Sequence, residues 1–588
     1  MPVEGLRRRL VVPTVLISLC MAVVTGPGQS ARTGFTDPTR RDLADDVAEA
    51  LALWLPDELS ARGVPGAAAV VVDRNGVVSQ ETWGTTGLPA SKPVTADTIF
   101  CIRSVSKSVT ALAVLFAVQE GLVDLDIPIT EYLEDFTINS RFEKNPELQI
   151  TLRHMLSHWA SFAHDPPFGI DLEQRDYFRA YIDRISDTWL RFPVGYRHEY
   201  SNYGYDLAGH ILEQRSGMKF ADYLQEKIFE PLDMTDSTFD LHVAEQSSKR
   251  AVGHRRTSEM SVHFPEIASG GMYSSIRDMG KLAMFHLNGA VIDGRRLLRE
   301  DLMEQYHSIQ FAQGDQRTGY TLGLIREPVG STVSLYHEGG GRGYASHMML
   351  YPELGVGAVL LTNLEYHGLT GVSGRKVMNA PILAEFAVDV SDDTTIEEHG
   401  QIPTDAPAVE AVLGRYGDSP SISVGIDNGQ LGLRDEGGVF DPLVLFEDDG
   451  ELLGRLSGTM EVRFLRPFRG RPGSMMLVNR KVANRNNHYR DYNDSPDDPV
   501  GPNKPEWGAY IGTYDVTWED EAESTVEVEV RNGYLYFRDG KSEEHEPGLF
   551  FLYDGNVIDF RSEPPTFANQ KIRRKLEYVD KDEEETSR

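Results

Sequence analysis

Residues 100–110 read Phe-Cys-Ile-Arg-Ser-Val-Ser-Lys-Ser-Val-Thr, and the rest of the chain is interpreted around them. Residues 109–118 are almost all apolar until Gly121 stops the run, which predicts a loop or strand that delivers a serine to a buried helix. Positions three apart share a helix face, so the amine of Lys107 can lie beside the hydroxyl of Ser104. Because an apolar wall disfavours the charged form of a lysine, Lys107 can act as the base that activates this serine.

The pattern S-x-x-K also occurs elsewhere in the chain, for example at residues 373–376. This copy lies in a polar, glycine-containing stretch, after which we expect no buried helix. An isolated match of this kind is more often a polar helix start with a solvated lysine. The apolar run behind Ser104 therefore favours the first copy as the one that carries chemistry.

The length and charge of the chain limit its possible architecture and partners. A chain of 588 residues is expected to hold several domains. Its 58 basic and 90 acidic residues give a net charge of −32, which argues against nucleic acid and anionic membrane surfaces as partners. We interpret the acidity as a source of solubility.

The N-terminus predicts a secretory leader. Residues 7–9 are arginines and residues 10–24 form an apolar run, which is short for a bilayer span but suits a signal peptide. Small residues follow, and we expect cleavage after Ser30, with Gly28 at the −3 position. The sequence thus predicts a signal peptide over residues 1–30 and a secreted or periplasmic protein. The alternative is an uncleaved anchor, the one case in which we expect membrane contact.

Two other candidates for chemistry are set aside. Cys101 is the one cysteine of the mature chain, so no intramolecular disulfide is possible, and its apolar neighbours favour a packing role over a nucleophilic one. His154 and His158 lie four apart on a helix that Thr151 is expected to cap, a spacing that also suits a metal pair. No third ligand stands nearby, so we predict structural histidines, with no metal and no other cofactor.

The elements that surround these motifs follow from apolar spacing and turn residues. We predict a helix over 42–55, a hairpin over 66–78 with Asn-Gly at its turn, and a helix over 203–215 that Gly217 ends. Strands are expected at 331–336, 346–351 and 356–361. Glycines at 339–341 would let a ligand approach the backbone between the first two of these strands.

The C-terminal part of the chain differs in pattern. Residues 392–407 and 484–505 are polar and contain prolines, and both are interpreted as linkers. Between and after them, short strands with Asn-Gly and Asp-Gly turns recur as an internal repeat. This repeat predicts two small antiparallel β-barrels or sandwiches, neither of which shows a catalytic set.

Three stretches in this order resemble a known superfamily: Ser104 with Lys107, Tyr200-Ser201-Asn202, and His337-Glu338-Gly339. They are similar to the S-x-x-K, Y-x-N and H-x-G motifs of serine β-lactamases and penicillin-binding proteins, specifically the class C branch. The resemblance covers roughly residues 40–390.

This resemblance implies an α+β fold. We expect a class C β-lactamase-like catalytic domain, with an antiparallel sheet flanked by helices plus an all-helical subdomain. Two small antiparallel β-barrel modules, lipocalin-like, would follow, an architecture similar to that of D-stereospecific aminopeptidases. The expected boundaries are 1–30 for the signal peptide, 40–391 for the hydrolase domain, and 408–483 and 506–579 for the two modules.

The resemblance also implies roles for the site residues. Ser104 would attack a carbonyl carbon and form an acyl-enzyme, while Lys107 and Tyr200 would share the proton transfers. Which of these two is the base stays open. Asn202 would hydrogen-bond the substrate and help to hold Lys107.

The third motif would line the substrate at the edge of the sheet. His337 and Gly339 are expected to contact the substrate. The backbone N–H groups of Ser104 and Gly340 would form the oxyanion hole, since fixed donors best stabilise charge on a tetrahedral oxygen.

His337 stands where class C β-lactamases usually carry a lysine, and an imidazole is mostly neutral at pH 7. This disfavours β-lactamase activity. We therefore expect a serine hydrolase of the D-aminopeptidase, DD-peptidase or esterase type, acting on small amide, D-amino-acid-containing peptide or ester substrates. Loops such as 163–190 would set substrate choice.

The sequence leaves one other interpretation open and excludes another. The alternative to an enzyme is a non-catalytic or slowly deacylating penicillin-binding-type protein that holds cell-wall peptides. An α/β-hydrolase is excluded because the chain contains no G-x-S-x-G motif.

Overall fold

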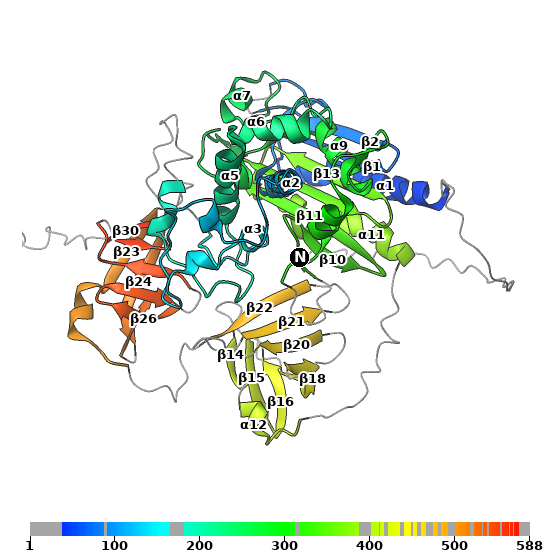
Figure 1. Ribbon diagram of the computed structural model, residues 1–588. Helices are drawn as coiled ribbons and strands as arrows, with labels where there is room; N and C mark the ends of the chain where they lie inside the picture. The colour runs from blue at the N-terminus through cyan, green and yellow to red at the C-terminus, as the bar shows by residue number, and fades with distance from the viewer. Residues whose placement is uncertain are drawn as a thin grey trace, which may run out of the picture. The chain divides into compact units, whose positions relative to one another are not determined.

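The computed structural model describes residues 38–87, 91–164, 182–311, 318–386 and, with short gaps, 402–574 (Figure 1). The predicted signal peptide and most of the loop 163–190 lie outside the described residues. Within the described part, no helix has both the length and the apolar character that a membrane span requires.

The region of residues 38–386 is built on one seven-stranded antiparallel sheet of order β2-β1-β13-β12-β11-β10-β9. The hairpin and the three later strands predicted from the sequence are confirmed. The strands are β1 (Gly66–Asp73), β2 (Val77–Gly84), β9 (Gly319–Tyr320), β10 (Ile325–Val329), β11 (Thr332–Gly341), β12 (Tyr344–Tyr351) and β13 (Val356–Thr362).

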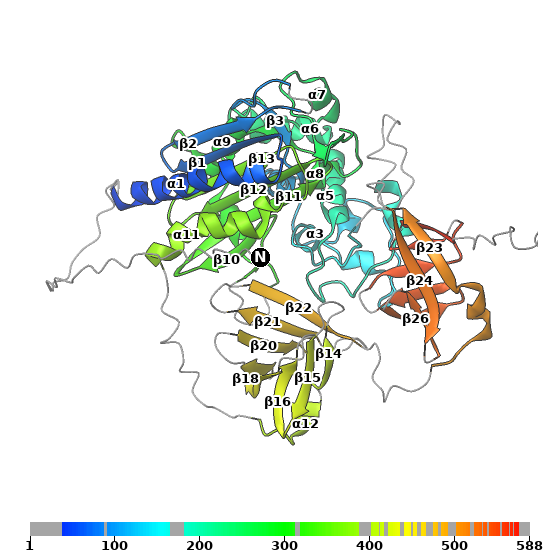
Figure 2. The same ribbon diagram turned by 180° about the vertical axis from the view of Figure 1, so that it is seen from behind.

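Helices cover both faces of this sheet (Figure 2). Side chains alternate between the two faces of a strand. In β1, Ala67, Ala69 and Val71 therefore join a core with α1 (Pro38–Ala61) and α11 (Gly374–Phe386). Ala68 and Val70 join the core of α2 (Ser106–Gln119) and α9 (Ile276–Leu287). Burial on both faces explains why β1 is apolar from Gly66 to Val72.

The helix α2 lies inside the second core, with its residues 106–117 all buried. Beside it pack α5 (Asn202–Ser216) and α8 (Ile267–Gly270), and a small side chain is needed where these two meet. A Cβ added to Gly209 on α5 would lie 2.6 Å from the Cβ of Ala268 on α8. Gly209 thus lets the two helices approach closely.

Shorter elements complete the domain. The helices are α3 (Leu152–Leu156), α6 (Phe220–Leu224), α7 (Leu241–Gln246) and α10 (Glu300–His307). The two-stranded sheets pair β3 (Ile99–Cys101) with β6 (Tyr273–Ser275), β4 (His254–Arg255) with β5 (Ser258–Glu259), and β7 (Val291–Ile292) with β8 (Arg295–Arg296). Helices and an antiparallel sheet together make the domain α+β, as expected.

The S-x-x-K copy at residues 373–376 agrees with its prediction. The helix α11 begins within this copy, but only Gly374, Met378 and Ile382 of that helix are buried, so it is not a buried helix like α2. Lys376 itself is exposed, so it lacks the dry surroundings that would make it a base.

The C-terminal repeat forms two antiparallel β structures with separate hydrophobic cores. The first is a nine-stranded sheet made of β14 (Gly414–Tyr416), β15 (Ile422–Asp427), β16 (Gln430–Arg434), β17 (Phe440–Pro442), β18 (Val444–Asp448), β19 (Glu451–Arg455), β20 (Met460–Leu465), β21 (Ser474–Asn479) and β22 (Asn484–Asp491). The second is a closed barrel made of β23 (Gly512–Thr517), β24 (Glu523–Arg531), β25 (Tyr534–Phe537), β26 (Gly540–Glu546), β27 (Leu549–Leu552), β28 (Val557–Asp559), β29 (Thr566–Phe567) and β30 (Gln570–Arg574).

One predicted linker needs correction. Residues 484–491 form β22, which pairs with β21 on one side and β14 on the other. The first module therefore continues beyond residue 483, the boundary expected from composition. Polar composition misled the prediction because a strand is held by backbone hydrogen bonds to its neighbours, whatever its side chains.

Replacing Leu112, fully buried on α2, tests the packing of this core. Leu112→Ala removes buried methyl groups and leaves a cavity, so we expect a loss of about 2–5 kcal/mol of unfolding free energy. The matched control is Leu53→Ala on α1, where the side chain is 74% exposed and the expected change is within about 0.5 kcal/mol. Scanning calorimetry of both variants measures the difference; equal midpoints would contradict the placement of α2.

Candidate active site

Ser104 lies in a tight turn at the start of α2. Residues 103–105 form a 3₁₀ turn and the α-helix begins at Ser106. Arg103, just before the serine, has a φ of 47°, in the left-handed region that non-glycine residues rarely occupy. Its buried guanidinium lies 4.4 Å from the centre of the Phe264 ring and 3.6 Å from a carboxylate oxygen of Glu266, which holds the turn in place.

Lys107 is fully buried one turn further along. Its Nζ lies 3.2 Å from Ser104 Oγ, 2.7 Å from Asn202 Oδ1 and 2.8 Å from the backbone oxygen of Ser269. A neutral amine has two N–H groups and one lone pair. With the two fixed oxygens of Asn202 and Ser269 accepting the N–H groups, the lone pair is left facing Ser104.

Burial lowers the pKa of Lys107 to about 7, against the opposing pull of the nearby carboxylates of Asp206 and Glu266. Burial also raises the pKa of Asp206. Asp206 in turn accepts hydrogen bonds of 2.9 Å from the backbone N–H and from the hydroxyl of Ser269. Asp206 thereby fixes the residue whose backbone oxygen accepts from Lys107.

Tyr200 is placed with the serine and the lysine. Its ring centre lies 4.9 Å from Lys107 Nζ, and an interaction with the Ser104 side chain partly opposes the effect of burial on its pKa. Burial raises the pKa of Tyr200, so the phenol keeps its proton at neutral pH. The three residues Ser104, Lys107 and Tyr200, far apart in sequence, converge as the sequence predicted.

Asn202, the first residue of α5, connects Lys107 to a buried acid. Its Oδ1 accepts from Lys107, and its Nδ2 donates to Glu266 Oε1 at 2.9 Å. Because Glu266 also faces Arg103, one carboxylate orients both the amide that holds the lysine and the side chain that precedes the serine.

His337, on β11, is buried and neutral. Its Nε2 lies 2.8 Å from the hydroxyl of Tyr320 and its Nδ1 lies 2.6 Å from the backbone oxygen of Glu338. Nδ1 is therefore the protonated nitrogen, and Nε2 accepts from the Tyr320 hydroxyl. Burial and the nearby Lys107 lower the pKa of His337 well below its usual value, so it offers no positive charge to a ligand.

Gly339 brings β11 against the turn before Ser104. A Cβ at this position would lie 2.3 Å from the backbone oxygen of Ile102 and 2.4 Å from Ser346 Oγ. A larger residue would push the strand away from the serine. Gly340 comes next and is exposed, with open space where its Cβ would be. The proposed oxyanion pair of Ser104 and Gly340 stays a prediction.

The two histidines considered as a metal pair make other contacts. His158 Nδ1 accepts from the backbone N–H of Ser201 at 3.1 Å, and its ring lies 4.2 Å from that of Tyr200. His154 Nδ1 is 2.9 Å from the hydroxyl of Thr151, the predicted cap, whose oxygen accepts from the backbone N–H of His154. Both thus pack and orient the helix start and the tyrosine loop.

Cys101 is buried behind the site. Its thiol donates to the backbone oxygen of Gly270 at 3.4 Å, and burial raises its pKa, which disfavours the reactive thiolate. Its position agrees with the packing role predicted from its apolar neighbours.

Five residues of this site were missed by sequence reasoning. They are joined to the motifs through space: Arg103, Asp206, Glu266, Ser269 and Tyr320. Two signals were present in the sequence. One was an arginine directly before the motif serine. The other was Asp206, an aspartate among apolar residues in the first turns of the helix that begins at Asn202.

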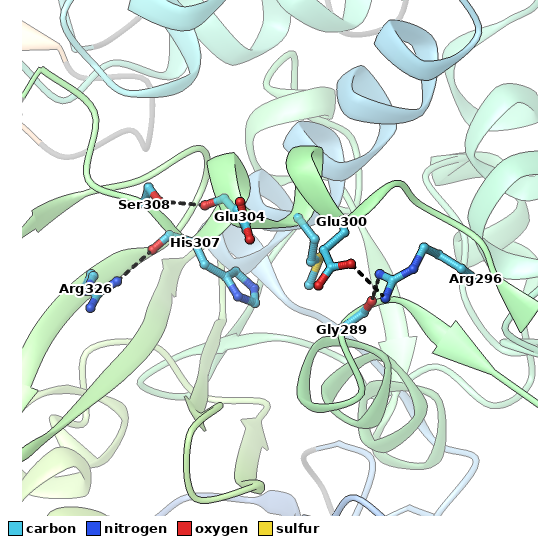
Figure 3. A pocket seen from close by; sticks show the side chains of 8 residues that line it. Gly289, Arg296, Glu300, Glu304, His307, Ser308 and Arg326 are labelled. Carbon is cyan, nitrogen blue, oxygen red and sulfur yellow. Dashed lines mark hydrogen bonds and ion pairs between the residues drawn. The ribbon is translucent and has the colours of Figure 1, made fainter. Parts of the chain in front are cut away.

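A cavity of about 350 Å³ lies elsewhere, beside α10 (Figure 3). Both arginines that line it already have partners within its wall. Arg296 donates to the backbone oxygen of Gly289 and faces Glu300 at 3.7 Å, while Arg326 donates to the backbone oxygen of His307. None of the predicted site residues lines it, and we assign it no role.

Comparison with known proteins matches residues 43–377 to the beta-lactamase family model. A beta-lactamase of Yersinia enterocolitica is 24% identical over 346 residues, covering 52% of this chain and 84% of the relative. Esterase EstB of Burkholderia gladioli is 26% identical over 386 residues, covering 57% and 95%. The D-alanyl-D-alanine-carboxypeptidase/endopeptidase AmpH of Escherichia coli is 26% identical over 318 residues, covering 51% and 79%.

The matched region contains the serine, lysine and tyrosine that the structure brings together, as well as the sheet edge with His337. It also spans more than half of the chain. On these grounds the protein belongs to the beta-lactamase family of the serine β-lactamase and penicillin-binding protein superfamily.

Proposed function

We propose that the protein is a serine hydrolase that cleaves small esters or amides through an acyl-enzyme on Ser104. The observation that carries this proposal is the placement of Lys107, whose amine is buried, has a pKa of about 7 and lies 3.2 Å from the serine oxygen. A base with a pKa near the working pH combines a populated neutral form with useful basicity.

Lys107 is the better candidate for the base than Tyr200. Burial lowers the pKa of Lys107, so its unprotonated form is populated at neutral pH. The raised pKa of Tyr200 keeps its phenol protonated. In the proposed sequence, Lys107 takes the proton of Ser104 as the serine oxygen bonds to the carbonyl carbon. The leaving group then receives that proton through the Tyr200 hydroxyl as its bond to the carbonyl carbon breaks. Water next attacks the acyl carbon and passes a proton by the same route to the Ser104 oxygen, whose bond to the acyl carbon breaks to release the acid.

The developing oxyanion would be held by the backbone N–H groups of Ser104 and Gly340. The close contact of Gly339 with Ile102 supports this pairing, because it brings β11 beside the residues that precede the serine. Fixed backbone donors stabilise such charge without reorganisation.

The neutral state of His337 bears on the acyl donor. A ligand carboxylate would find no positive charge on this side chain, which favours neutral esters and amides over β-lactams. The name of EstB supports the ester class, and that of AmpH supports D-amino-acid peptides, of which those without a carboxylate beside the scissile bond suit a neutral His337. We propose these two classes and do not favour β-lactam hydrolysis.

Replacing the proposed nucleophile tests the reaction. For Ser104→Ala we expect no labelling by a fluorophosphonate probe and a loss of at least ~10³-fold in kcat/KM, because the group that forms the acyl bond is gone. The substrates are D-alanyl and L-alanyl anilides, short-chain p-nitrophenyl esters and nitrocefin. The matched control is Ser373→Ala in the S-x-x-K copy at residues 373–376, which should behave as wild type.

Equal labelling of Ser104→Ala and wild type would end the proposal. A wild type that is labelled once and then turns over none of the substrates would favour the alternative, a penicillin-binding-type protein that deacylates slowly. Nitrocefin hydrolysis that outpaces the esters would overturn the substrate assignment.

The depressed pKa of Lys107 predicts the pH dependence of acylation. The amine must be unprotonated to accept the serine proton, so the rate should fall as pH drops below about 7 and level off above it. The measurement is the rate of probe labelling between about pH 5 and about pH 9. Lys107→Arg should abolish labelling at every pH, whereas Lys376→Arg should keep the wild-type profile. A flat profile would exclude Lys107 as the base.

We also propose that the protein is exported, secreted or periplasmic, through its N-terminal leader. The arginines at 7–9 and the apolar run at 10–24 support this. Mass spectrometry of the protein from a secreting host should find a mature protein that begins directly after Ser30. A cell-associated product that keeps residues 1–30 would show an uncleaved anchor instead.

A further inference from the structure

Two histidines and one glutamate meet at the surface beside α7. The nitrogen or oxygen ligand atoms of His242, Glu245 and His263 all lie within 4.8 Å of one another. His263 Nε2 is 3.1 Å from Glu245 Oε2, and the rings of the two histidines have centroids 5.1 Å apart. Three metal-ligating side chains thus converge outside the catalytic site.

The local structure of α7 presents two of the three. Asp240 caps the helix by accepting from the backbone N–H groups of His242 and Val243. Residues 242 and 245, three apart, share one face of the helix and are exposed. Leu241 and Ala244 are buried and anchor the other face. The ligating face is therefore held toward solvent.

The third side chain comes from a separate segment that is equally well anchored. His263 is only partly exposed and lies between Val262, 6% exposed, and Phe264, 1% exposed. Two buried neighbours fix its backbone, so its imidazole is held beside α7. A site made from two anchored segments needs little ordering on binding.

We propose that His242, Glu245 and His263 bind one divalent transition-metal ion of the zinc type, with water in the fourth position. Two imidazole nitrogens and one carboxylate oxygen are a ligand set that Zn²⁺ accepts, whereas Mg²⁺ and Ca²⁺ prefer oxygen ligands. Bond lengths of about 2.0–2.1 Å place tetrahedral ligands roughly 3.4 Å apart, so only a small closing movement is needed.

Binding here would tie α7 to a segment that reaches the catalytic site. Phe264, which follows His263, stacks against the Arg103 guanidinium at 4.4 Å. Glu266, three residues after His263, accepts from Asn202. The ion would thus hold α7 against the segment that supports Asn202 and Arg103. It would take no part in the chemistry at Ser104.

Isothermal titration calorimetry of the full, tag-free protein with ZnCl₂ tests the proposal, with MgCl₂ as the comparison metal. We expect one saturable zinc site and no magnesium binding. His263→Ala and Glu245→Gln each remove a ligand and should weaken zinc binding by more than about 10-fold. The control is His545→Asn, which removes an exposed imidazole on β26 and should bind zinc as wild type does.

Hydrogen exchange supplies a second measurement that does not depend on activity. Zinc should slow amide exchange in residues 258–266 of the wild type and leave that segment unchanged in His263→Ala. The proposal is overturned if the wild type shows no saturable zinc binding, or if His263→Ala binds zinc as tightly as the wild type. Neither measurement depends on turnover. The zinc proposal can therefore fail or succeed independently of the hydrolase proposal.

Discussion

The constraint on which the site depends is the placement of one buried amine between two fixed oxygens. Asn202 Oδ1 and the backbone oxygen of Ser269 accept from Lys107, and the third direction points at Ser104 Oγ. Each acceptor comes from a different helix, α5 or α8, and the lysine comes from α2. The three helices must therefore pack closely, which the small residues Gly209 and Ala268 at the α5–α8 contact allow.

The sequence predicted the parts of this arrangement that local rules control. Ser104 and Lys107 are three apart on one helix, so their contact follows from helix geometry alone. The hairpin predicted over 66–78 and the strand predicted over 331–336, just before His337, followed from apolar runs and turn residues, and both extend further in the structure. Tyr200 and Asn202 were placed by resemblance, because nothing local in the chain says which distant pocket a loop tyrosine enters.

What the sequence did not predict is carried by contacts between distant segments. Glu266 contacts Asn202, which lies 64 residues earlier in the chain, and it also contacts Arg103. No spacing in the sequence marks either contact. Asp206 lies on a helix where an acid normally faces water, and only packing turns it toward Ser269. The same limit explains β22: its two partner strands, not its polar composition, make it a strand.

The burial that lowers the pKa of Lys107 also keeps the histidine at position 337 neutral. Desolvation lowers the pKa values of Lys107 and His337 together, and their mutual repulsion lowers that of His337 further. A lysine at 337 would bring a second ammonium group toward the same dry space, and one of the two would have to lose its charge. The imidazole avoids this competition because it is stable in its neutral form. Its Nε2 accepts a hydrogen bond from the Tyr320 hydroxyl. The charge of the pocket is then set by Lys107 against Asp206 and Glu266, which leaves the amine free to change protonation near neutral pH.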